Sequence, residues 1–179
     1  MRGRTFWVLA LVFGLHAVLG AVIGLSVDEA HYLLYAAHPA LSYFDHPPLV
    51  GWVQWPLVAL GAPVGVLRQI PGLLWLATVW GVYRLTLRVL VGQAHAAQAA
   101  LAAVLALVLA PLLHVLGIGL LPDTLLMALT VALMHQTWTL MQPGAAERKA
   151  PWLVLGVLLG LAGLAKYTAV FTAVAVGLC

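Results

Sequence analysis

The chain has 179 residues, of which 64% are hydrophobic and only 7% are charged, and its mean hydropathy is +1.08. These values exclude a soluble globular domain and indicate an integral membrane protein. The formal net charge is +3, and the sequence has no run of basic residues interleaved with aromatic ones. Nothing in the sequence therefore supports nucleic-acid binding.

Long uncharged stretches predict the membrane-spanning helices, because about 20 helical residues cross the hydrocarbon core. Basic residues beside a span favour the cytoplasm, and one topology places the three basic groups that flank spans on that side. In this topology the amino terminus is cytoplasmic and about five helices cross the membrane. The predicted spans are residues 5–25, 69–87, 97–118 and 124–141, and a fifth apolar segment begins near Trp152.

Residues 26–68 are predicted to form the first external loop. Their second half, residues 47–67, is apolar enough to cross a membrane but contains four prolines and three glycines. A crossing there would also move Arg84 and Arg88 outside, against the charge rule. We therefore interpret residues 47–67 as an interfacial segment, with Trp52 and Trp55 at headgroup depth.

Three of the five acidic residues, Asp28, Glu29 and Asp45, lie in this loop. The predicted topology places them outside, together with Asp123. Ionisable groups next to hydrocarbon are costly, so their presence asks for a functional explanation.

A short helix is predicted to begin at Ser26, because Ser26 and Glu29 fit a capping box. This leaves open whether Glu29 is only a cap. In such a helix Asp28, His31, Tyr32 and Tyr35 would share one face. That face suits either an acid-base site or an amphipathic helix on lipid headgroups.

Three other polar sites in the sequence each allow two interpretations. Asp45 and His46 precede two prolines that restrict the backbone, which fits either an ordinary loop or a site. Asp123 follows a proline at the start of a span, as a carboxylate stabilised by the helix dipole or as a second active-site acid. Lys166 would lie about 22 Å along a helix from Pro151. It either snorkels to the external interface or awaits an anion such as a lipid phosphate.

The strings Asp28-Glu29-Ala30-His31-Tyr32 and Tyr43-Phe44-Asp45-His46-Pro47-Pro48-Leu49 closely resemble the first external loop of polyprenyl-phosphate-sugar-dependent membrane glycosyltransferases. These include the protein mannosyltransferase superfamily, the aminoarabinose transferases acting on lipid A, and the lipopolysaccharide-core galacturonosyl transferases. Pro122-Asp123-Thr124 resembles their second acidic motif, and residues 160–168 resemble their glycine-rich lysine segment. The resemblance covers essentially the whole chain, in the right order.

The resemblance implies the type C glycosyltransferase fold, an all-α polytopic transmembrane bundle with amphipathic juxtamembrane helices in the first external loop. It also implies that Asp28 is the catalytic carboxylate that activates the acceptor hydroxyl, and that Asp123 is a second acid. Asp45 and His46 would shape the donor pocket, and Lys166 would contact the donor phosphate. The remaining expected substrate-binding residues are Glu29, Tyr32, Arg68 and Tyr167.

We therefore predict transfer of a sugar from a polyprenyl-phosphate-linked donor to a lipid, glycan or protein acceptor, with inversion. A carboxylate can take the proton of the attacking hydroxyl, and a fixed cation can stabilise the leaving phosphate. A monophosphate leaving group has less need of a metal than a diphosphate, so we assign no definite cofactor. A divalent cation stays open, since Asp28, His46 and Asp123 have the chemistry to hold one. The expected location is the bacterial inner membrane, with the active site on the periplasmic side.

Two other classes of function remain open. A proton-coupled transporter or channel would use Asp28, Glu29 and Asp123 as a relay, but transporters place such groups near the midplane and show repeated halves. A non-catalytic membrane subunit or inactive fragment is the other alternative. Because the chain stops inside an apolar segment, we predict one domain over residues 1–179 that is incomplete at its carboxyl end.

Overall fold

The computed structural model describes residues 2–178, and Met1 and Cys179 lie outside that range. The regular structure within it is entirely helical, as predicted. The helices are α1 (Arg2–Val22), α2 (Val27–Ala37), α3 (Leu49–Ala59), α4 (Val64–Leu67), α5 (Gln69–Val89), α6 (Ala96–Val108), α7 (Pro111–Ile118), α8 (Pro122–Leu140), α9 (Lys149–Ala165) and α10 (Ala169–Gly177).

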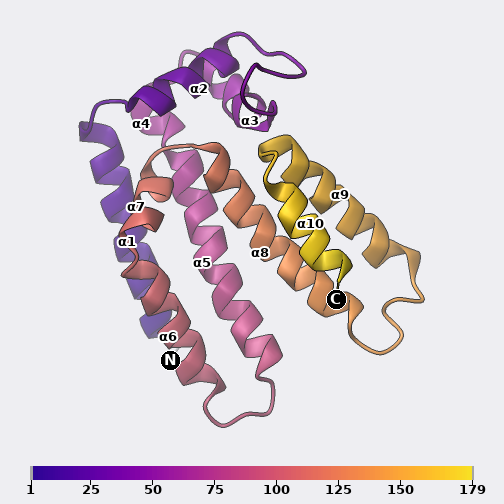
Figure 1. Ribbon diagram of the computed structural model, residues 1–179. Helices are drawn as coiled ribbons and strands as arrows, with labels where there is room; N and C mark the ends of the chain where they lie inside the picture. Colours follow the sequence, from indigo (N-terminus) through magenta and orange to yellow (C-terminus); the bar gives the residue numbers. More distant parts are fainter. Residues whose placement is uncertain (1, 179) are drawn as a thin grey trace.

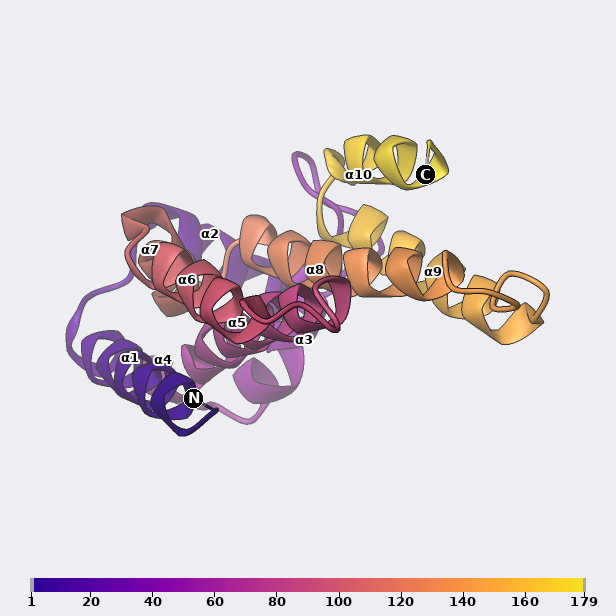
Figure 2. The same ribbon diagram turned by 90° about the horizontal axis from the view of Figure 1, so that it is seen from below.

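The long helices lie side by side and alternate in direction (Figure 1). The helices α1, α6 and α9 run towards the end of the molecule that carries α2 and α3, whereas α5 and α8 run away from it. Seen from below, α5 lies among its neighbours rather than at the margin (Figure 2), and it contacts α1, α4, α6, α7 and α8. We call the end with α2 and α3 the acidic end and the opposite end the basic end.

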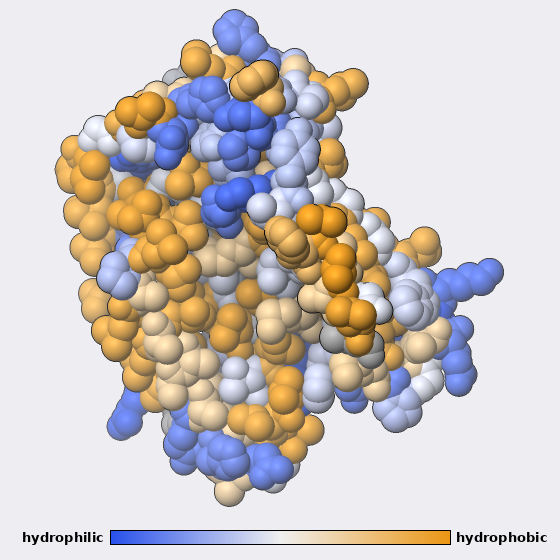
Figure 3. Space-filling view, in the orientation of Figure 1, coloured by the Kyte–Doolittle hydropathy of each residue, from blue (hydrophilic) through white to orange (hydrophobic). Residues whose placement is uncertain are grey.

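An apolar band separates the two ends. Hydrophilic residues gather at the acidic end and at the basic end, and hydrophobic residues cover most of the face between them (Figure 3). The loop from α8 to α9, with Arg148 and Lys149, lies at the basic end together with the last turns of α5, which carry Arg84 and Arg88. The predicted separation of basic and acidic groups is therefore present in the structure.

The number of predicted spans is supported only in part. Within the described residues, two helices are long and apolar enough to cross a membrane, Gly3–Val22 and Val64–Val89, and a third counts if the pair α6–α7 is one span. The other two predicted crossings correspond to α8 and α9. With 17 residues, α9 rises about 26 Å, somewhat less than the hydrocarbon thickness of about 30 Å.

The second span begins earlier than predicted. It extends over Val64–Val89, so Arg68 lies inside its first turns and not at the end of the external loop. Pro63, in an extended conformation, precedes this span. A proline is tolerated at a helix start because it has no N–H to donate to a preceding turn. The helix before it, α3, has 11 residues and rises only about 16 Å. This length agrees with the prediction of an interfacial segment as far as Pro63, whereas residues 64–67, which were predicted to belong to that segment, are part of the second span.

The predicted span over residues 97–118 is not one continuous helix. The helices α6 and α7 meet at an angle of 72°, with Pro111 as the first residue of α7. A proline lacks the N–H that would bond back along the helix and forces the residue before it out of the helical region. His114 Nε2 lies 2.6 Å from the Val108 carbonyl oxygen, and His114 Nδ1 lies 2.8 Å from His16 Nε2. At the bend, His114 thus gives a hydrogen-bond partner to a carbonyl of the last turn of α6 and to the imidazole of α1.

The chain also turns back after α9. Lys166 is extended, residues 166–168 form a turn, and α10 packs against α8 and α9. In Figure 1, α10 runs back towards the basic end. Lys166 therefore lies at the end of a helix, near the acidic end, and not in the middle of a longer span.

Two helices of the acidic end approach each other closely. A Cβ on Gly51 of α3 would lie 2.8 Å from Tyr35 Cβ and 3.1 Å from its carbonyl carbon, so only glycine allows α2 and α3 this contact. Beneath them is a core that includes Tyr32, Val50 and Leu125. This core fixes the acidic end on the long helices.

Candidate active site

The start of α2 is fixed by a capping box, as predicted. The Glu29 N–H donates to Ser26 Oγ at 3.2 Å, and Glu29 Oε2 accepts from the Ser26 N–H at 3.0 Å. Glu29 is buried. Burial raises the pKa of its carboxyl, but hydrogen bonds from Arg68 and Ser26 outweigh this and hold the pKa below its ordinary value.

Arg68 joins α2 to the end of α1. Its Nε and Nη2 donate to the two carboxylate oxygens of Glu29 at 2.8 and 2.9 Å. Three further hydrogen bonds, of 2.6 to 3.0 Å, reach the carbonyls of Gly20, Ile23 and Gly24, which the last turn of a helix leaves without partners. A guanidinium has five N–H donors, and all five are used. The structure therefore gives Glu29 and Arg68 internal partners, and the substrate contacts expected of them stay a prediction.

Tyr32 lies near enough to three carboxylates for their charges to act on its hydroxyl. Its ring is buried. Burial, together with the negative charges of Asp45, Asp28 and Asp123, raises the pKa of its hydroxyl to about 12. Because each of these carboxylates acts on one hydroxyl, the structure brings together acids that are far apart in the sequence. Tyr32 itself stays protonated at neutral pH and can donate a hydrogen bond.

Asp45 is bound by side chains from α2. The hydroxyl of Tyr35 donates to Oδ1, and His31 Nε2 lies 2.9 Å from the Tyr35 oxygen and 3.4 Å from Oδ2. His46 Nδ1 is 3.1 Å from Oδ2, although it is not aligned for a hydrogen bond. The hydrogen bond from Tyr35 is the main reason why the pKa of Asp45 is lowered to about 2. Asp45 is therefore a fixed negative charge near Tyr32.

The loop that carries Asp45 is held by two aromatic residues. Tyr43 stacks on Tyr35 with 3.7 Å between ring centroids, and its hydroxyl donates to the Tyr35 carbonyl at 2.7 Å. Trp52 Nε1 donates to the Ala40 carbonyl at 2.8 Å. Trp52 was expected to lie at headgroup depth, and this bond to the loop was not foreseen. Trp55, its neighbour in that prediction, is half exposed.

Asp123 and Lys166 form an ion pair. Lys166 Nζ donates to both carboxylate oxygens of Asp123, at 2.6 and 2.7 Å. The side chains are 25% and 48% exposed for Lys166 and Asp123, so solvent or a ligand can reach both. The sequence left open whether Lys166 snorkels or awaits an anion, and did not foresee this carboxylate as its partner. The turn after α9 brings Lys166 to the start of α8.

Asp123 is positioned by the residue that follows it. The Thr124 hydroxyl is buried, accepts from the Leu121 N–H at 3.3 Å, and lies within 3.1–3.2 Å of the carbonyls of Leu116 and Gly119. Pro122 is fully buried beside it. The first turn of α8 is thereby anchored, and Asp123 is held at its amino end.

The other predicted residues are open to solvent. Asp28 is exposed in the first turn of α2, and Tyr167 is 60% exposed in the turn after Lys166. Within residues 2–178, no group of three His, Cys, Asp or Glu side chains has the arrangement of a metal site. Asp28, His46 and Asp123 therefore do not form a prearranged ligand set.

His31 and Tyr35 were not among the residues expected to be catalytic or to bind substrate. Their spacing of four residues on α2 was visible and predicted a shared face, but not that Asp45 folds back onto that face. The pairing of Lys166 with Asp123 was also not predicted, since it spans 43 residues of sequence.

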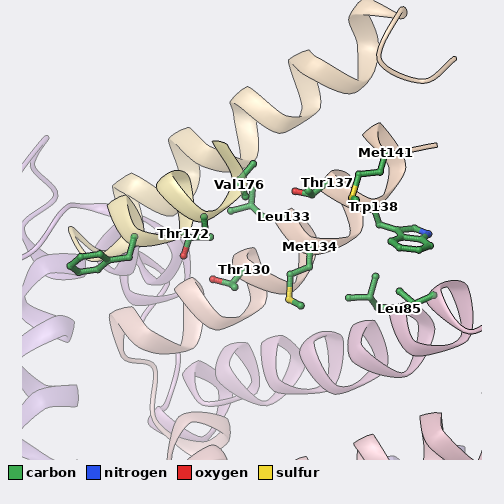
Figure 4. A pocket seen from close by; sticks show the side chains of 12 residues that line it. Leu85, Thr130, Leu133, Met134, Thr137, Trp138, Met141, Thr172 and Val176 are labelled. Carbon is green, nitrogen blue, oxygen red and sulfur yellow. The ribbon is translucent and has the colours of Figure 1, made fainter. Parts of the chain in front are cut away.

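A hollow in the surface lies away from these polar groups. It has a volume of about 520 Å³, and it is lined by residues of α5, α8 and α10, including Leu85, Met134 and Phe171. Figure 4 shows the Thr130, Thr137 and Thr172 side chains among mainly apolar ones. Since no ionisable side chain lines it, this hollow has no group for acid-base chemistry.

The comparisons with known proteins give one family. The profile of the family described as dolichyl-phosphate-mannose-protein mannosyltransferase matches residues 45–178. This range is well over half of the chain and includes Asp45, His46, Asp123 and Lys166, whereas Asp28 lies before it. No curated protein and no solved structure matches the chain. The chain thus belongs to the dolichyl-phosphate-mannose-protein mannosyltransferase family, membrane glycosyltransferases that use a lipid-phosphate mannose donor.

Proposed function

We propose that the acidic end of the chain transfers a sugar from a polyprenyl-phosphate donor to an acceptor hydroxyl. In this proposal Asp28 is the general base, Lys166 contacts the donor phosphate, and Asp123 positions Lys166. The acidic end faces the outside of the membrane, and α8 and α9 cross the membrane in addition to the three spans above. The single observation that carries the proposal is the part-exposed ion pair of Lys166 with Asp123, whose Nζ–O distances are 2.6 and 2.7 Å.

The chemistry of the proposed transfer follows from these charges. The attacking hydroxyl loses a proton as it bonds to the anomeric carbon, and an exposed carboxylate such as Asp28 can take that proton. The bond from the anomeric carbon to the phosphate oxygen breaks, and its electron pair leaves with the lipid phosphate. Attack from the side opposite the phosphate inverts the anomeric centre.

Lys166 is suited to stabilise the leaving phosphate. A charge-assisted hydrogen bond to a phosphate oxygen is strongest where water is partly excluded, and Lys166 is only 25% exposed. A donor phosphate would either share the Lys166 ammonium with the carboxylate of Asp123 or replace that carboxylate as its partner. Tyr32 remains a neutral donor in the site because its pKa is raised to about 12.

A proton-coupled transporter has less support. Proton relays in membrane proteins use ionisable groups inside the bundle. Here Asp28 is exposed, and the side chain of Asp123 is 48% exposed at the start of α8.

The proposal is tested by sugar transfer with the variant Asp28→Asn, measured on the full chain in membranes with polyprenyl-phosphate mannose as donor. Asparagine keeps the shape but is not a base, so we expect at least a hundred-fold loss of transfer, the lower range of general-base contributions. Glu147→Gln is the matched control, because Glu147 is an exposed acid at the basic end. Transfer by Asp28→Asn close to that of the control would remove Asp28 from the proposed role.

A further inference from the structure

One face of α5 is open along most of its length. Leu73, Ala77, Trp80 and Arg84 are exposed, and their spacing of four, three and four residues places them in one row on the helix. The row is apolar towards the acidic end and basic at the other end. Arg88, four residues beyond Arg84, continues it.

The two arginines line one hollow. It has a volume of about 420 Å³ and is formed by Trp80, Gly81, Arg84 and Arg88 of α5 with His135 of α8. A hollow of about 400 Å³ adjoins it and shares Trp80 and both arginines. We call these two hollows together the arginine pocket.

The charges of the arginine pocket are not neutralised from within the protein. Arg88 Nη1 lies 3.1 Å from His135 Nδ1, and its Nη2 donates to Thr139 Oγ1 at 3.0 Å. His135 Nε2 lies 2.8 Å from the Gly81 carbonyl, so it donates there and Nδ1 accepts from Arg88. Among residues 2–178, no carboxylate lies within ion-pair distance of Arg84 or Arg88. The pocket therefore holds two positive charges beside only neutral partners.

An apolar groove leads away from the arginine pocket. It has a volume of about 470 Å³ and lies between α1 and α5, with Phe6, Phe13, Leu73 and Leu76 among its walls. It shares Ala77 and Trp80 with the pocket. From Leu73 to Arg84 the helix rises about 16 Å, which matches one leaflet of a hydrocarbon core about 30 Å thick.

We propose that the arginine pocket and the apolar groove form a binding site for one anionic phospholipid of the leaflet at the basic end. The phosphate would pair with Arg84 and Arg88, and an acyl chain would lie in the groove against Trp80. Basic pockets between membrane helices bind anionic headgroups, and a groove of one leaflet's length fits a lipid rather than a soluble anion. This site is separate from the proposed sugar-transfer site and does not depend on it.

The test is native mass spectrometry of the full chain in detergent, titrated with phosphatidylglycerol or with phosphatidylcholine of the same acyl chains. We expect one phosphatidylglycerol to be retained in preference to phosphatidylcholine, and Arg84→Gln to weaken its binding about five-fold, the usual effect of one arginine at a membrane surface. Arg84 has no hydrogen bond or ion pair among the described residues, so the variant is expected to fold, and an unchanged melting temperature checks this. Arg148→Gln, at the basic end but outside the pocket, is the matched control.

A second variant tests the groove. Ala77→Phe narrows it and leaves both arginines in place, so we expect weaker phosphatidylglycerol binding, whereas soluble glycerophosphoglycerol should not displace the lipid. Three results would overturn the proposal. They are equal binding by Arg84→Gln and the wild type, equal losses in Arg84→Gln and Arg148→Gln, and full displacement by the soluble headgroup.

Discussion

Replacing Glu29 with glutamine removes one charge of the buried pair with Arg68 and keeps the shape of the side chain. The side chains of Arg68 and Glu29 are only 3% and 10% exposed, so the guanidinium is left without a counter-charge away from water. Removing one partner of such a pair costs about 3–5 kcal/mol. Because the glutamine oxygen still accepts a hydrogen bond, we expect the lower value, about 3 kcal/mol.

The neighbouring acid gives the matched comparison. Asp28 is exposed in the first turn of α2, where its interaction with the helix dipole is worth at most about 1 kcal/mol. Glu29→Gln should therefore lower the melting temperature by roughly 6–12 °C, and Asp28→Asn by less than about 4 °C. The assay is thermal unfolding of the purified full chain in one detergent. Equal shifts for the two variants would refute the assignment of a structural role to Glu29 and of a free carboxylate to Asp28.

Three more predictions concern the acidic end. Because the pKa of Glu29 is lowered in the folded chain, the stability that its charge contributes is complete above its ordinary pKa of 4.5 and is lost as pH falls below that value. The difference in melting temperature between wild type and Glu29→Gln should therefore shrink as the pH falls. A difference that stays constant with pH would contradict this. Gly119→Ala should cost about 1–3 kcal/mol, because its Cβ would lie 3.1 Å from Glu29 Cδ. Gly160→Ala in α9 meets nothing within 4 Å, so equal stability of the two alanine variants would count against this packing. Tyr35→Phe removes the main cause of the low pKa of Asp45, so Asp45 should become protonated at a higher pH than in wild type. On acidification, amide hydrogen exchange in residues 38–48 should therefore begin to accelerate at a higher pH in this variant. The same starting pH in both proteins would argue against the hydrogen bond from Tyr35 to Asp45.

The course of the helices was largely predictable, because charge and hydrophobic length determine where a chain can cross a membrane. The capping box at Ser26 was also predictable, since it depends on residues three positions apart. The bend at Pro111 was not predicted, although a proline inside an apolar stretch was the available signal. Apolar length alone does not distinguish a straight span from a broken one.

The sequence pointed to candidate site residues but not to the contacts that they make. The sequence identified Asp28, Asp45, Asp123 and Lys166 as unusual charges in an apolar chain. It did not indicate that Lys166 pairs with Asp123, because that pairing depends on the turn after α9. Nor did it distinguish Arg68, whose five donors are all used internally, from a cation available to substrate.

The central claim is that Asp28 acts in the chemical step while Lys166 holds the donor phosphate. The most direct measurement compares donor binding with transfer in Asp28→Asn and Lys166→Met, using polyprenyl-phosphate mannose and the full chain. The account predicts that Asp28→Asn binds the donor with nearly wild-type affinity but transfers sugar at least about a hundred-fold more slowly, and that Lys166→Met binds the donor weakly. Weak donor binding by Asp28→Asn, or wild-type binding by Lys166→Met, would contradict the account.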